Sequence, residues 1–352
     1  MDQRKATLAD VARLAGVSTA TASRAVSSPE MVSIEVRTRI QAVIEKLGYV
    51  PNPAARALAS ARSNIVGVLI PSVTNNVFAD VLRGIYSVAH DTPMEVQLGN
   101  TRYSVLEEEN LIKVFLSQRP AGLIIAGIDQ STTSLRLLKE ARCPIVQVME
   151  TGDDPIDMMI GFSHRQAAYE ATVHLIERGY RKIAFLGARM DPRTQRRLSG
   201  FSQALKEAGL YSERRIVTTP KPSTVTLGCQ LLDELLSRDA EADAVFCNND
   251  DLALGVLFEC QRRQLDVPGR FGICGFNDLE MMGVANPPVS SVRTFRQKMG
   301  ELAMQMLLAA IAGKRPEHSK VDIGFEIVGR QSTQRASGAF LPMSDAPTRV
   351  GG

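Results

Sequence analysis

Residues 8–27 read LADVARLAGVSTATASRAVS, and the rest of the chain is organised around this stretch. Its first apolar side chains recur at intervals of three and four, as on one face of a helix, at Leu8, Val11, Ala12 and Ala15. Gly16 can take the left-handed conformation that ends a helix, and Ser18 can cap a second helix directly after it. Two short helices joined by such a turn form a helix-turn-helix motif.

The second helix has two unlike faces. One carries Ala22, Ala25 and Val26, and the other carries Thr19, Ala20, Ser23 and Arg24. An arginine can donate two hydrogen bonds to guanine, hydroxyl groups can bond bases or phosphates, and an alanine methyl can touch a thymine methyl. The second face therefore suits the major groove of DNA. Amphipathic helix pairs with a glycine turn also occur in proteins that bind no DNA, and these residues alone leave that alternative open.

Charge is concentrated at the start of the chain. The chain has 352 residues, a length that permits two or three domains with a large core. It contains 41 Lys and Arg against 38 Asp and Glu. Residues 1–62 hold nine basic and five acidic side chains, whereas the remainder is nearly neutral. A basic head on a near-neutral body is expected where only the head meets phosphate groups.

A third helix and a linker follow the motif. Ser33 can cap a helix with apolar positions at Ile34, Ile40, Val43, Ile44 and Leu47, and Gly48 can end it. Two prolines come next, and residues 53–59 then combine strong helix formers with Asn52 as a cap. A helix of about two turns is marginal in water, so we expect this segment to fold only against a partner.

The ordered pattern of residues 8–26, 32–40 and 47–58 resembles the LacI/GalR family of bacterial repressors. By that resemblance residues 53–59 are similar to the hinge helix that folds on operator DNA, with Leu58 wedged into the minor groove and Ala55 beside it. An apolar wedge of this kind bends the duplex onto more protein surface. An ordinary core position for Leu58 is the alternative. The predicted DNA-contacting residues are Thr7, Ser18, Thr19, Ala20, Thr21, Ser23, Arg24, Ser33, Asn52, Ala55, Arg56 and Leu58.

From residue 65 onward, short apolar runs alternate with helical periods, which is typical of parallel α/β sheets. The first series has strands expected at 65–70, 94–98, 122–126 and 143–149, with helices at 77–89, 106–116 and 133–141. The second has strands expected at 182–187, 215–219, 242–247 and 271–276, with helices near 166–178, 196–208, 226–238 and 251–264. We expect residues 290–295 and a helix over 297–312 to return to the first lobe, and residues 321–330 to close the fold.

The predicted fold is an all-α helix-turn-helix headpiece followed by an α/β core of two Rossmann-like lobes, similar to a periplasmic binding protein. The headpiece spans 1–50, the hinge helix 51–62 and the core 63–333. Lobe one is expected at 63–162 and 291–322, and lobe two at 163–290 and 323–333, with crossings near 161–164, 290–292 and 323–324. Residues 334–352 lack periodicity and resemble a disordered tail without a leucine heptad, so we expect a homodimer without a tetramerising coiled coil.

Ligands of open parallel sheets bind beyond the carboxyl ends of the strands, so polar side chains there are candidates for effector binding. They are Asn75, Phe78, Glu150, Arg197, Asn249, Asp250, Asn277 and Arg296. Asp250 could instead cap a helix, and Asn277 could close a turn. Arg197 needs an anion near a cleft, which is either a ligand or Glu150.

The stretch from Met149 to Met158, with residues 161–164 after it, is similar to the family branch that senses gluconate and related sugar acids. The chain has no Trp, so ring stacking on a sugar falls to Phe78 or another Phe, or is absent. A linear acid such as gluconate or 2-ketogluconate needs no stacking platform. A neutral sugar or a nucleobase is the alternative effector.

A cytoplasmic sugar-binding protein, or an enzyme with an accessory DNA-binding head, is the alternative from another class. The sequence has no G-x-x-x-x-G-K-[ST], H-E-x-x-H or G-x-S-x-G pattern, and no G-x-G-x-x-G after a strand. His164 and His174 are isolated, and the five cysteines show no metal-binding spacing, so we expect no metal and no cofactor. No export signal or membrane span is evident, which predicts a cytoplasmic location.

We therefore interpret the chain as a transcriptional repressor. Closure of the cleft around a small metabolite would change the spacing of the two hinge helices in a dimer. The affinity of the dimer for a pseudo-palindromic operator would change as a result.

Overall fold

The structure is a computed structural model that describes residues 6–27, 29–50 and 63–335. The predicted hinge helix, with Asn52, Ala55, Arg56 and Leu58, lies outside the described residues. So does the predicted tail from residue 336 onward. No helix in the described ranges combines the length and apolar character needed to cross a membrane.

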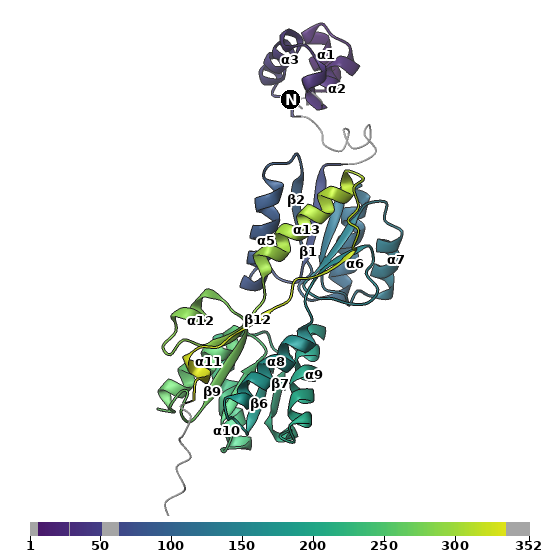
Figure 1. The fold of residues 1–352 in the computed structure, drawn as a ribbon. Coiled ribbons are helices and arrows are strands. Elements are labelled where there is room, and N and C mark those ends of the chain that lie inside the picture. The colour runs from purple at the N-terminus through teal and green to yellow at the C-terminus, as the bar shows by residue number, and fades with distance from the viewer. Residues whose placement is uncertain (1–5, 28, 51–62, 336–352) are drawn as a thin grey trace, which may run out of the picture.

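The described residues of the headpiece form a small bundle of three α-helices and one 3-10 turn. Figure 1 labels the helices α1, α2 and α3. Its elements are α1 (Leu8–Ala15), α2 (Thr19–Ser27), the turn Pro29–Met31 and α3 (Ile34–Leu47). Val11, Ala15, Ala25 and Ile40 form its buried core. The helix-turn-helix prediction is confirmed.

The sequence anticipates most of the headpiece helix ends. Gly16 ends α1 with a φ of 64°, and the backbone N–H of Thr21 donates to Ser18 Oγ at 3.1 Å at the start of α2. Ser33 precedes α3 but makes no side-chain cap, contrary to the prediction. Ile34 is 73% exposed, whereas Val36 and Ile40 on the same helix supply the contacts with the core.

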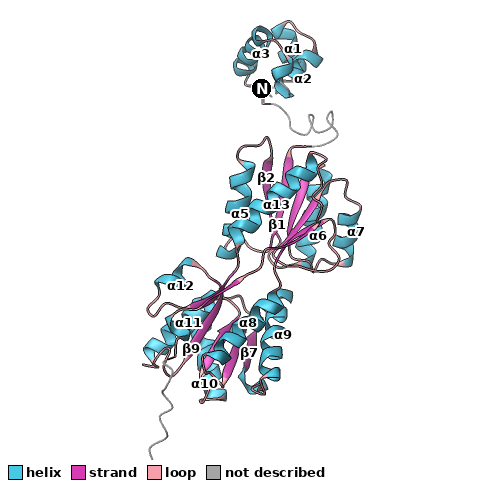
Figure 2. Ribbon diagram, viewed as in Figure 1, coloured by secondary structure: helices cyan, strands magenta, loops and turns pink. Residues whose placement is uncertain are grey.

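Lobe one is a parallel six-stranded sheet with the strand order β11-β5-β4-β3-β1-β2. Figure 2 shows its strands flanked by helices. Its strands are β1 (Ile65–Ile70), β2 (Glu95–Asn100), β3 (Gly122–Ala126), β4 (Ile145–Val148), β5 (Met158–Gly161) and β11 (Lys320–Asp322). Its helices are α5 (Asn76–Ala89), α6 (Val105–Ser117), α7 (Thr132–Lys139) and α13 (Arg296–Ile311). The central strands are buried on both faces, as expected for parallel strands covered by helices.

Lobe two is a second six-stranded sheet with the order β12-β10-β9-β8-β6-β7, in which only β12 runs antiparallel to its neighbour. Its strands are β6 (Ile183–Ala188), β7 (Ile216–Thr219), β8 (Ala244–Cys247), β9 (Gly272–Asn277), β10 (Ser290–Arg293) and β12 (Glu326–Val328). Its α-helices are α8 (His164–Glu177), α9 (Pro192–Glu207), α10 (Val225–Arg238), α11 (Asp250–Arg262) and α12 (Glu280–Val284). Short 3-10 turns lie at Glu213–Arg215 and Gln331–Thr333.

One strand assignment was wrong. We expected residues 290–295 to return to lobe one, but β10 pairs in parallel with β9 and belongs to lobe two. Ser290 and Ser291 are buried there, and Ser291 Oγ donates to the carboxylate of Asp250 at 2.7 Å. The chain therefore crosses between the lobes after β10, just before α13. Strand β5 was not anticipated either, although it extends the first sheet.

The two lobes share an apolar core through their crossings. Phe162 lies on the first crossing and Phe325 on the third, with ring centroids 6.5 Å apart. Phe276 at the end of β9 packs 6.2 Å from Phe162. All three belong to, or pack against, one hydrophobic cluster that contains residues of both sheets. The connection between the lobes is thus a packed structure rather than a loose tether.

Helices α5 and α13 lie side by side in Figure 1. They approach each other most closely at two glycines. A Cβ at Gly84 would overlap the carbonyl oxygen of Gln297, and one at Gly300 would overlap that of Val81. The two backbones are therefore in direct contact.

We expect Gly84→Ala to lower the free energy of unfolding by about 1–3 kcal/mol, because neither backbone can move away without disturbing the sheet. Gly283→Ala on α12 is the control, since the nearest atom to an added Cβ is 4.0 Å away. Urea denaturation of both variants checks this. Equal losses would contradict the close crossing.

Candidate functional site

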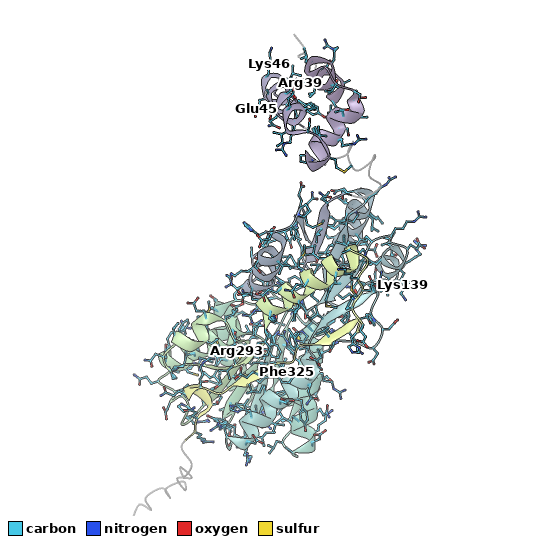
Figure 3. All side chains as sticks on the ribbon, turned by 45° about the horizontal axis from the view of Figure 1, so that its top comes forward. Arg39, Glu45, Lys46, Lys139, Arg293 and Phe325 are labelled. Carbon is cyan, nitrogen blue, oxygen red and sulfur yellow. The ribbon has the colours of Figure 1, made fainter. Side chains whose placement is uncertain are left out.

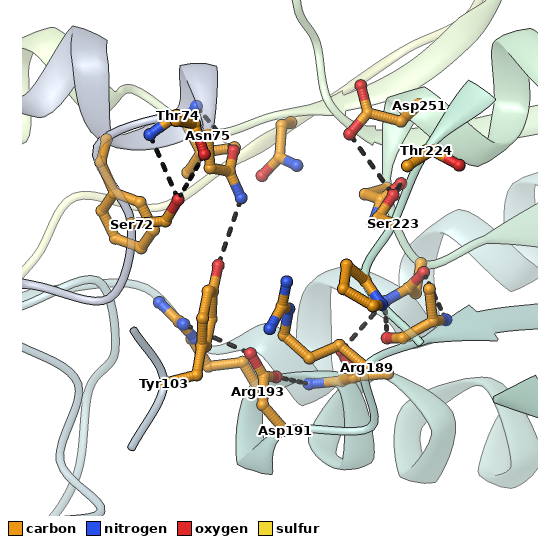
Figure 4. Close-up of a pocket in the computed structure, with 18 of the residues that line it drawn as sticks. Ser72, Thr74, Asn75, Tyr103, Arg189, Asp191, Arg193, Ser223, Thr224 and Asp251 are labelled. Carbon is orange, nitrogen blue, oxygen red and sulfur yellow. Dashed lines mark hydrogen bonds and ion pairs between the residues drawn. The ribbon is translucent and has the colours of Figure 1, made fainter. Parts of the chain in front are cut away.

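A cavity of about 330 Å³ lies between the lobes, at the carboxyl ends of their parallel strands (Figure 4). Lobe one contributes Ser72, Thr74, Asn75, Val77, Phe78, Tyr103 and Met149 to its wall. Lobe two contributes Ala188, Arg189, Asp191, Arg193, Thr194, Arg197, Pro222, Ser223, Thr224, Asn248, Asn249, Asp251 and Asn277. This is the position that the topology rule for open sheets predicts.

Arg197 is the most deeply buried cation of the cavity, with 7% of its surface exposed. Its Nε donates to His164 Nδ1 at 3.2 Å, its Nη1 donates to the backbone oxygen of Asn248, and its guanidinium lies 3.8 Å from the ring centroid of Phe276. Burial lowers its pKa to about 10, so it remains charged at neutral pH. Among the described residues, Arg197 has no ion-pair partner.

Two further arginines line the cavity, and sequence reasoning missed both of them. Arg193 contacts Asp191 at 3.3 Å, and Asp191 also caps α9 by accepting from the backbone of Thr194 at 2.9 Å. Arg189 lies over the ring of Tyr103 at 3.8 Å and so joins the two lobes. The sequence could have indicated them, because Arg189, Asp191 and Arg193 lie in the turn after β6 and the first turn of α9, at the carboxyl end of that strand.

The turns after β7 and β8 form a part of the wall that carries hydroxyl, amide and carboxylate side chains. Ser223 Oγ donates to Asn249 Oδ1 at 2.8 Å and lies 3.3 Å from Asp251 Oδ2. Asn249 also caps α11, with the backbone of Leu252 donating to it at 3.1 Å. Burial raises the pKa of Asp251. These groups can accept and donate hydrogen bonds to hydroxyl groups of a ligand.

The structure places Asn75, Phe78, Arg197, Asn249 and Asn277 on the cavity wall, as the sequence analysis predicts. Asn75 caps α5 and donates to the Tyr103 hydroxyl at 3.3 Å. Phe78 is almost fully buried. Asn277 has a backbone φ of 116°, and its buried Oδ1 has no hydrogen-bond partner among the described residues. An unpaired acceptor that borders a cavity is available to a ligand.

Asp250 and Arg296 do not line this cavity. Asp250 accepts from the backbone of Leu279 and from Ser291 Oγ, both at 2.7 Å, and so connects the segments around β8, β9 and β10. Burial raises its pKa to about 6. It does not cap α11, because Asn249 does. Arg296 pairs with Asp80 at 2.7 Å and donates to the backbone oxygen of Asn277, which ties the start of α13 to lobe two.

Glu150 also lies outside the cavity wall, and it is not the partner of Arg197. Its carboxylate lies 3.7 Å from Nε of Arg196, and the backbone of Thr151 donates to it at 3.0 Å. Arg196 of lobe two also binds both carboxylate oxygens of Asp129 of lobe one, at 2.8 and 2.5 Å. Burial raises the pKa of Glu150 to about 7. The three residues form a polar contact between the lobes beside the cavity.

His174 donates to or accepts from Thr333 Oγ1 at 2.9 Å, and His164 bonds Met149 and Arg197, so both have protein partners. No group of three His, Cys, Asp or Glu side chains in the described part of the chain is placed to hold a metal ion.

The headpiece presents a second candidate site on α2. Thr19, Ala20 and Arg24 are exposed, Ser23 is half-buried, and Ala22 on the opposite face is fully buried. The predicted contacts Ser18, Thr21 and Thr7 lie at helix starts. Ser18 bonds Thr21 at 2.8 Å, and Thr7 forms a capping box with Asp10.

The headpiece also exposes basic side chains on α3. Arg37, Arg39 and Lys46 on α3 are exposed, the last two being labelled in Figure 3, and the predicted contact Ser33 is exposed at the start of the same helix. An exposed arginine among short side chains is suited to contact bases in a DNA groove, and exposed cations elsewhere on the headpiece are suited to contact phosphate groups.

Comparison with known proteins covers both parts of the chain. Residues 7–52 match the family model described as bacterial regulatory proteins, lacI family, and residues 172–333 match that of a periplasmic binding protein-like domain. The HTH-type transcriptional regulator GntR of Pseudomonas aeruginosa is 42% identical over 327 residues, which are 93% of this chain and 95% of that protein.

Two solved structures are similar over the same extent. A LacI-family transcriptional regulator from Silicibacter pomeroyi has a TM-score of 0.88 at 33% identity, covering 94% of this chain and 100% of the other. The lac repressor dimer bound to operator and the anti-inducer ONPF has a TM-score of 0.80 at 25% identity, covering 94% and 99%.

Replacement of Glu150 tests its buried environment. Because the pKa of Glu150 is raised from 4.5 to about 7, the folded protein holds a proton there that the unfolded chain releases, and the free energy of unfolding falls as the pH rises between these values. We expect Glu150→Gln to be more stable than the wild type at pH 8 by roughly 1–3 kcal/mol, with no difference near pH 4.5.

Urea denaturation at intervals from pH 4.5 to pH 8 measures this. Glu107→Gln on the exposed face of α6 is the control and should leave the pH dependence unchanged. A pH dependence of Glu150→Gln identical to that of the wild type would show that Glu150 is not desolvated.

Proposed function

The chain belongs to the LacI family of bacterial regulatory proteins, and we propose that a small molecule bound between its lobes controls its affinity for operator DNA. The small molecule that we propose is a sugar acid of the class of gluconate or 2-ketogluconate. Like these relatives, it is a DNA-binding transcription regulator and not an enzyme. The effector, the dimer and the residues that bind DNA and ligand are the parts that we propose.

The observation that carries the proposal is the buried charge of Arg197. A cation taken out of water is costly unless a nearby anion compensates it. Arg193 already has Asp191 and Arg196 already has Glu150 and Asp129, whereas Arg197 has no carboxylate partner among the described residues. A ligand carboxylate that accepts hydrogen bonds from Arg197 would supply the missing charge.

The rest of the cavity suits a polyhydroxylated chain. Ser223, Asn249 and Asp251 provide hydroxyl, amide and carboxylate groups on the part of the wall beyond β7 and β8. An open-chain acid can then place its carboxylate at Arg197 and its hydroxyl groups at this polar wall. A neutral sugar or a nucleobase would fill the same volume but bring no carboxylate into contact with Arg197, which disfavours both alternatives.

On the DNA side, we propose that Arg24 with Thr19, Ala20 and Ser23 reads the major groove, supported by Ser18, Thr21, Thr7 and Ser33. We assign residues 1–50 to the headpiece, 51–62 to the hinge and 63–333 to the core. Residues Asn52, Ala55, Arg56 and Leu58 then belong to a hinge helix that contacts the minor groove. The similar lac repressor binds its operator as a dimer, which supports a dimer on a pseudo-palindromic site here. A regulator of chromosomal DNA would act in the cytoplasm.

Ligand control then requires a coupling between cleft and headpiece. Lobe one is connected to the headpiece through residues 51–62, so a rotation of lobe one on effector binding changes the spacing of the two headpieces in a dimer. A coupling free energy of about 1–3 kcal/mol would alter operator affinity roughly 5- to 150-fold.

Substitution of Arg24 tests the recognition face. We expect Arg24→Ala to reduce the ratio of operator to random-duplex affinity about 10- to 100-fold, because one bidentate base contact is worth about 1–3 kcal/mol of discrimination. Fluorescence anisotropy at fixed salt, with an operator selected from random DNA by the full-length protein, measures the ratio.

The matched control is Arg39→Ala, which also removes one exposed headpiece charge. It should lower the affinity for the operator and for the random duplex by the same factor, since a phosphate contact carries no sequence information. A wild-type ratio in Arg24→Ala would refute the assignment of the face.

Substitution of Arg197 tests the effector site. We expect gluconate or 2-ketogluconate, but not glucose or hypoxanthine, to raise the melting temperature of the wild-type protein, because a ligand that binds only the native state stabilises it. Arg197→Ala should lose this rise while its operator affinity without ligand is retained. Arg165→Ala, an exposed position on α8, should behave as wild type.

Thermal shift and operator titrations with and without the acid check both parts. A larger shift with a neutral sugar than with any acid in the wild-type protein would refute the sugar-acid proposal.

A further inference from the structure

His164 occupies the point where the first crossing from lobe one enters α8. Its side chain is fully buried. Nε2 lies 2.8 Å from the backbone oxygen of Met149, which follows the last strand residue of β4 in lobe one. Nδ1 lies 3.2 Å from Nε of Arg197 in lobe two. One imidazole ring therefore connects lobe one to the arginine of the proposed anion site.

The partners of His164 decide which ring nitrogen carries the proton. Arginine Nε can only donate and a carbonyl oxygen can only accept, so Nδ1 must be the acceptor and Nε2 must carry hydrogen. Burial, followed by the positive charge of Arg197, holds the pKa of His164 well below its usual value. The ring is thus a neutral acceptor toward Arg197 at physiological pH.

The guanidinium of Arg197 is held on several sides by groups other than a carboxylate. His164 accepts from Nε, the Asn248 carbonyl accepts from Nη1, and the Phe276 ring lies against one face at 3.8 Å. The same Phe276 ring stacks on His164, with centroids 5.7 Å apart and planes at 28°. An acceptor without charge fixes the orientation of the guanidinium but brings no negative charge into contact with it, and Asp191, Glu150 and Asp250 act on it only at longer range.

We infer that His164 is a positioning residue that orients the Arg197 guanidinium and thereby gives the cleft its preference for a carboxylate over an uncharged group. This inference rests on the proposed function, because it concerns the same cavity. A carboxylate at position 164 would neutralise Arg197, and an apolar residue would leave its Nε unpaired. Only a neutral acceptor directs the guanidinium while keeping its charge for the ligand.

The two hydrogen bonds of His164 can be separated by isosteric substitution. Asn places an oxygen near the position of the imidazole Nδ1, so His164→Asn keeps an acceptor for Arg197 and loses the bond to Met149. Gln places a nitrogen near the position of Nε2, so His164→Gln keeps the bond to Met149 and loses the acceptor. Each variant loses one buried hydrogen bond, which makes each the control for the stability cost of the other.

The experiment measures the dissociation constants of gluconate and gluconamide by calorimetry for the full-length wild-type protein and both variants. Gluconamide replaces the carboxylate with an uncharged amide of the same shape. We expect His164→Gln to lower the preference for gluconate over gluconamide about tenfold or more, the scale of one hydrogen bond to a charged group. His164→Asn should keep the preference within about threefold.

Equal losses of preference in the two variants, or parallel weakening of both ligands, would overturn the positioning role and leave the sugar-acid proposal intact. Failure of the wild-type protein to bind any sugar acid would refute the proposed function and the role of His164 with it. A histidine-selective ¹⁵N spectrum of the wild-type protein gives a test that needs no variant. It should show His164 protonated on Nε2 alone, and a protonated Nδ1 would overturn the inference.

Discussion

The structure is organised around the buried positive charge of Arg197, which forms no direct ion pair with a carboxylate among the described residues. Arg197 lies where the carboxyl ends of two parallel sheets face each other, with a carbonyl, an imidazole and an aromatic ring as its neighbours. Its side chain is almost fully buried. In such surroundings a charge interacts more strongly with a ligand than it would at the surface, so one arginine can determine the chemical class of the effector.

The contacts between the lobes divide into two kinds. Phe162, Phe276 and Phe325 form a packed apolar hinge, which resists separation of the lobes. Around it lie polar contacts that can exchange partners, such as Arg196 with Asp129 and Arg189 over Tyr103. A packed pivot surrounded by exchangeable polar contacts permits rotation of one lobe against the other without opening the core, as ligand control of a distant headpiece requires.

Much of the architecture could be predicted from the sequence because it depends on local patterns. The apolar run at 65–70 and the glycine at position 16 specify a buried strand and a helix end through near neighbours alone. The second crossing was placed wrongly, because the partner of β10 is β9 and nothing within residues 290–295 distinguishes one parallel sheet from another. The cavity position followed from topology, but the arginines at 189 and 193 were missed.

The sequence by itself determined the helix-turn-helix head, the two alternating α/β series and the placing of Arg197 near a cleft, since each rests on residues close together in the chain. Only the tertiary structure decided that Glu150 faces Arg196, that Asp250 joins three segments of lobe two, and that His164 lies between Met149 and Arg197. These pairings unite residues from different loops and strands. Their partners are set by how the two sheets are oriented about the hinge, and no local pattern specifies that orientation.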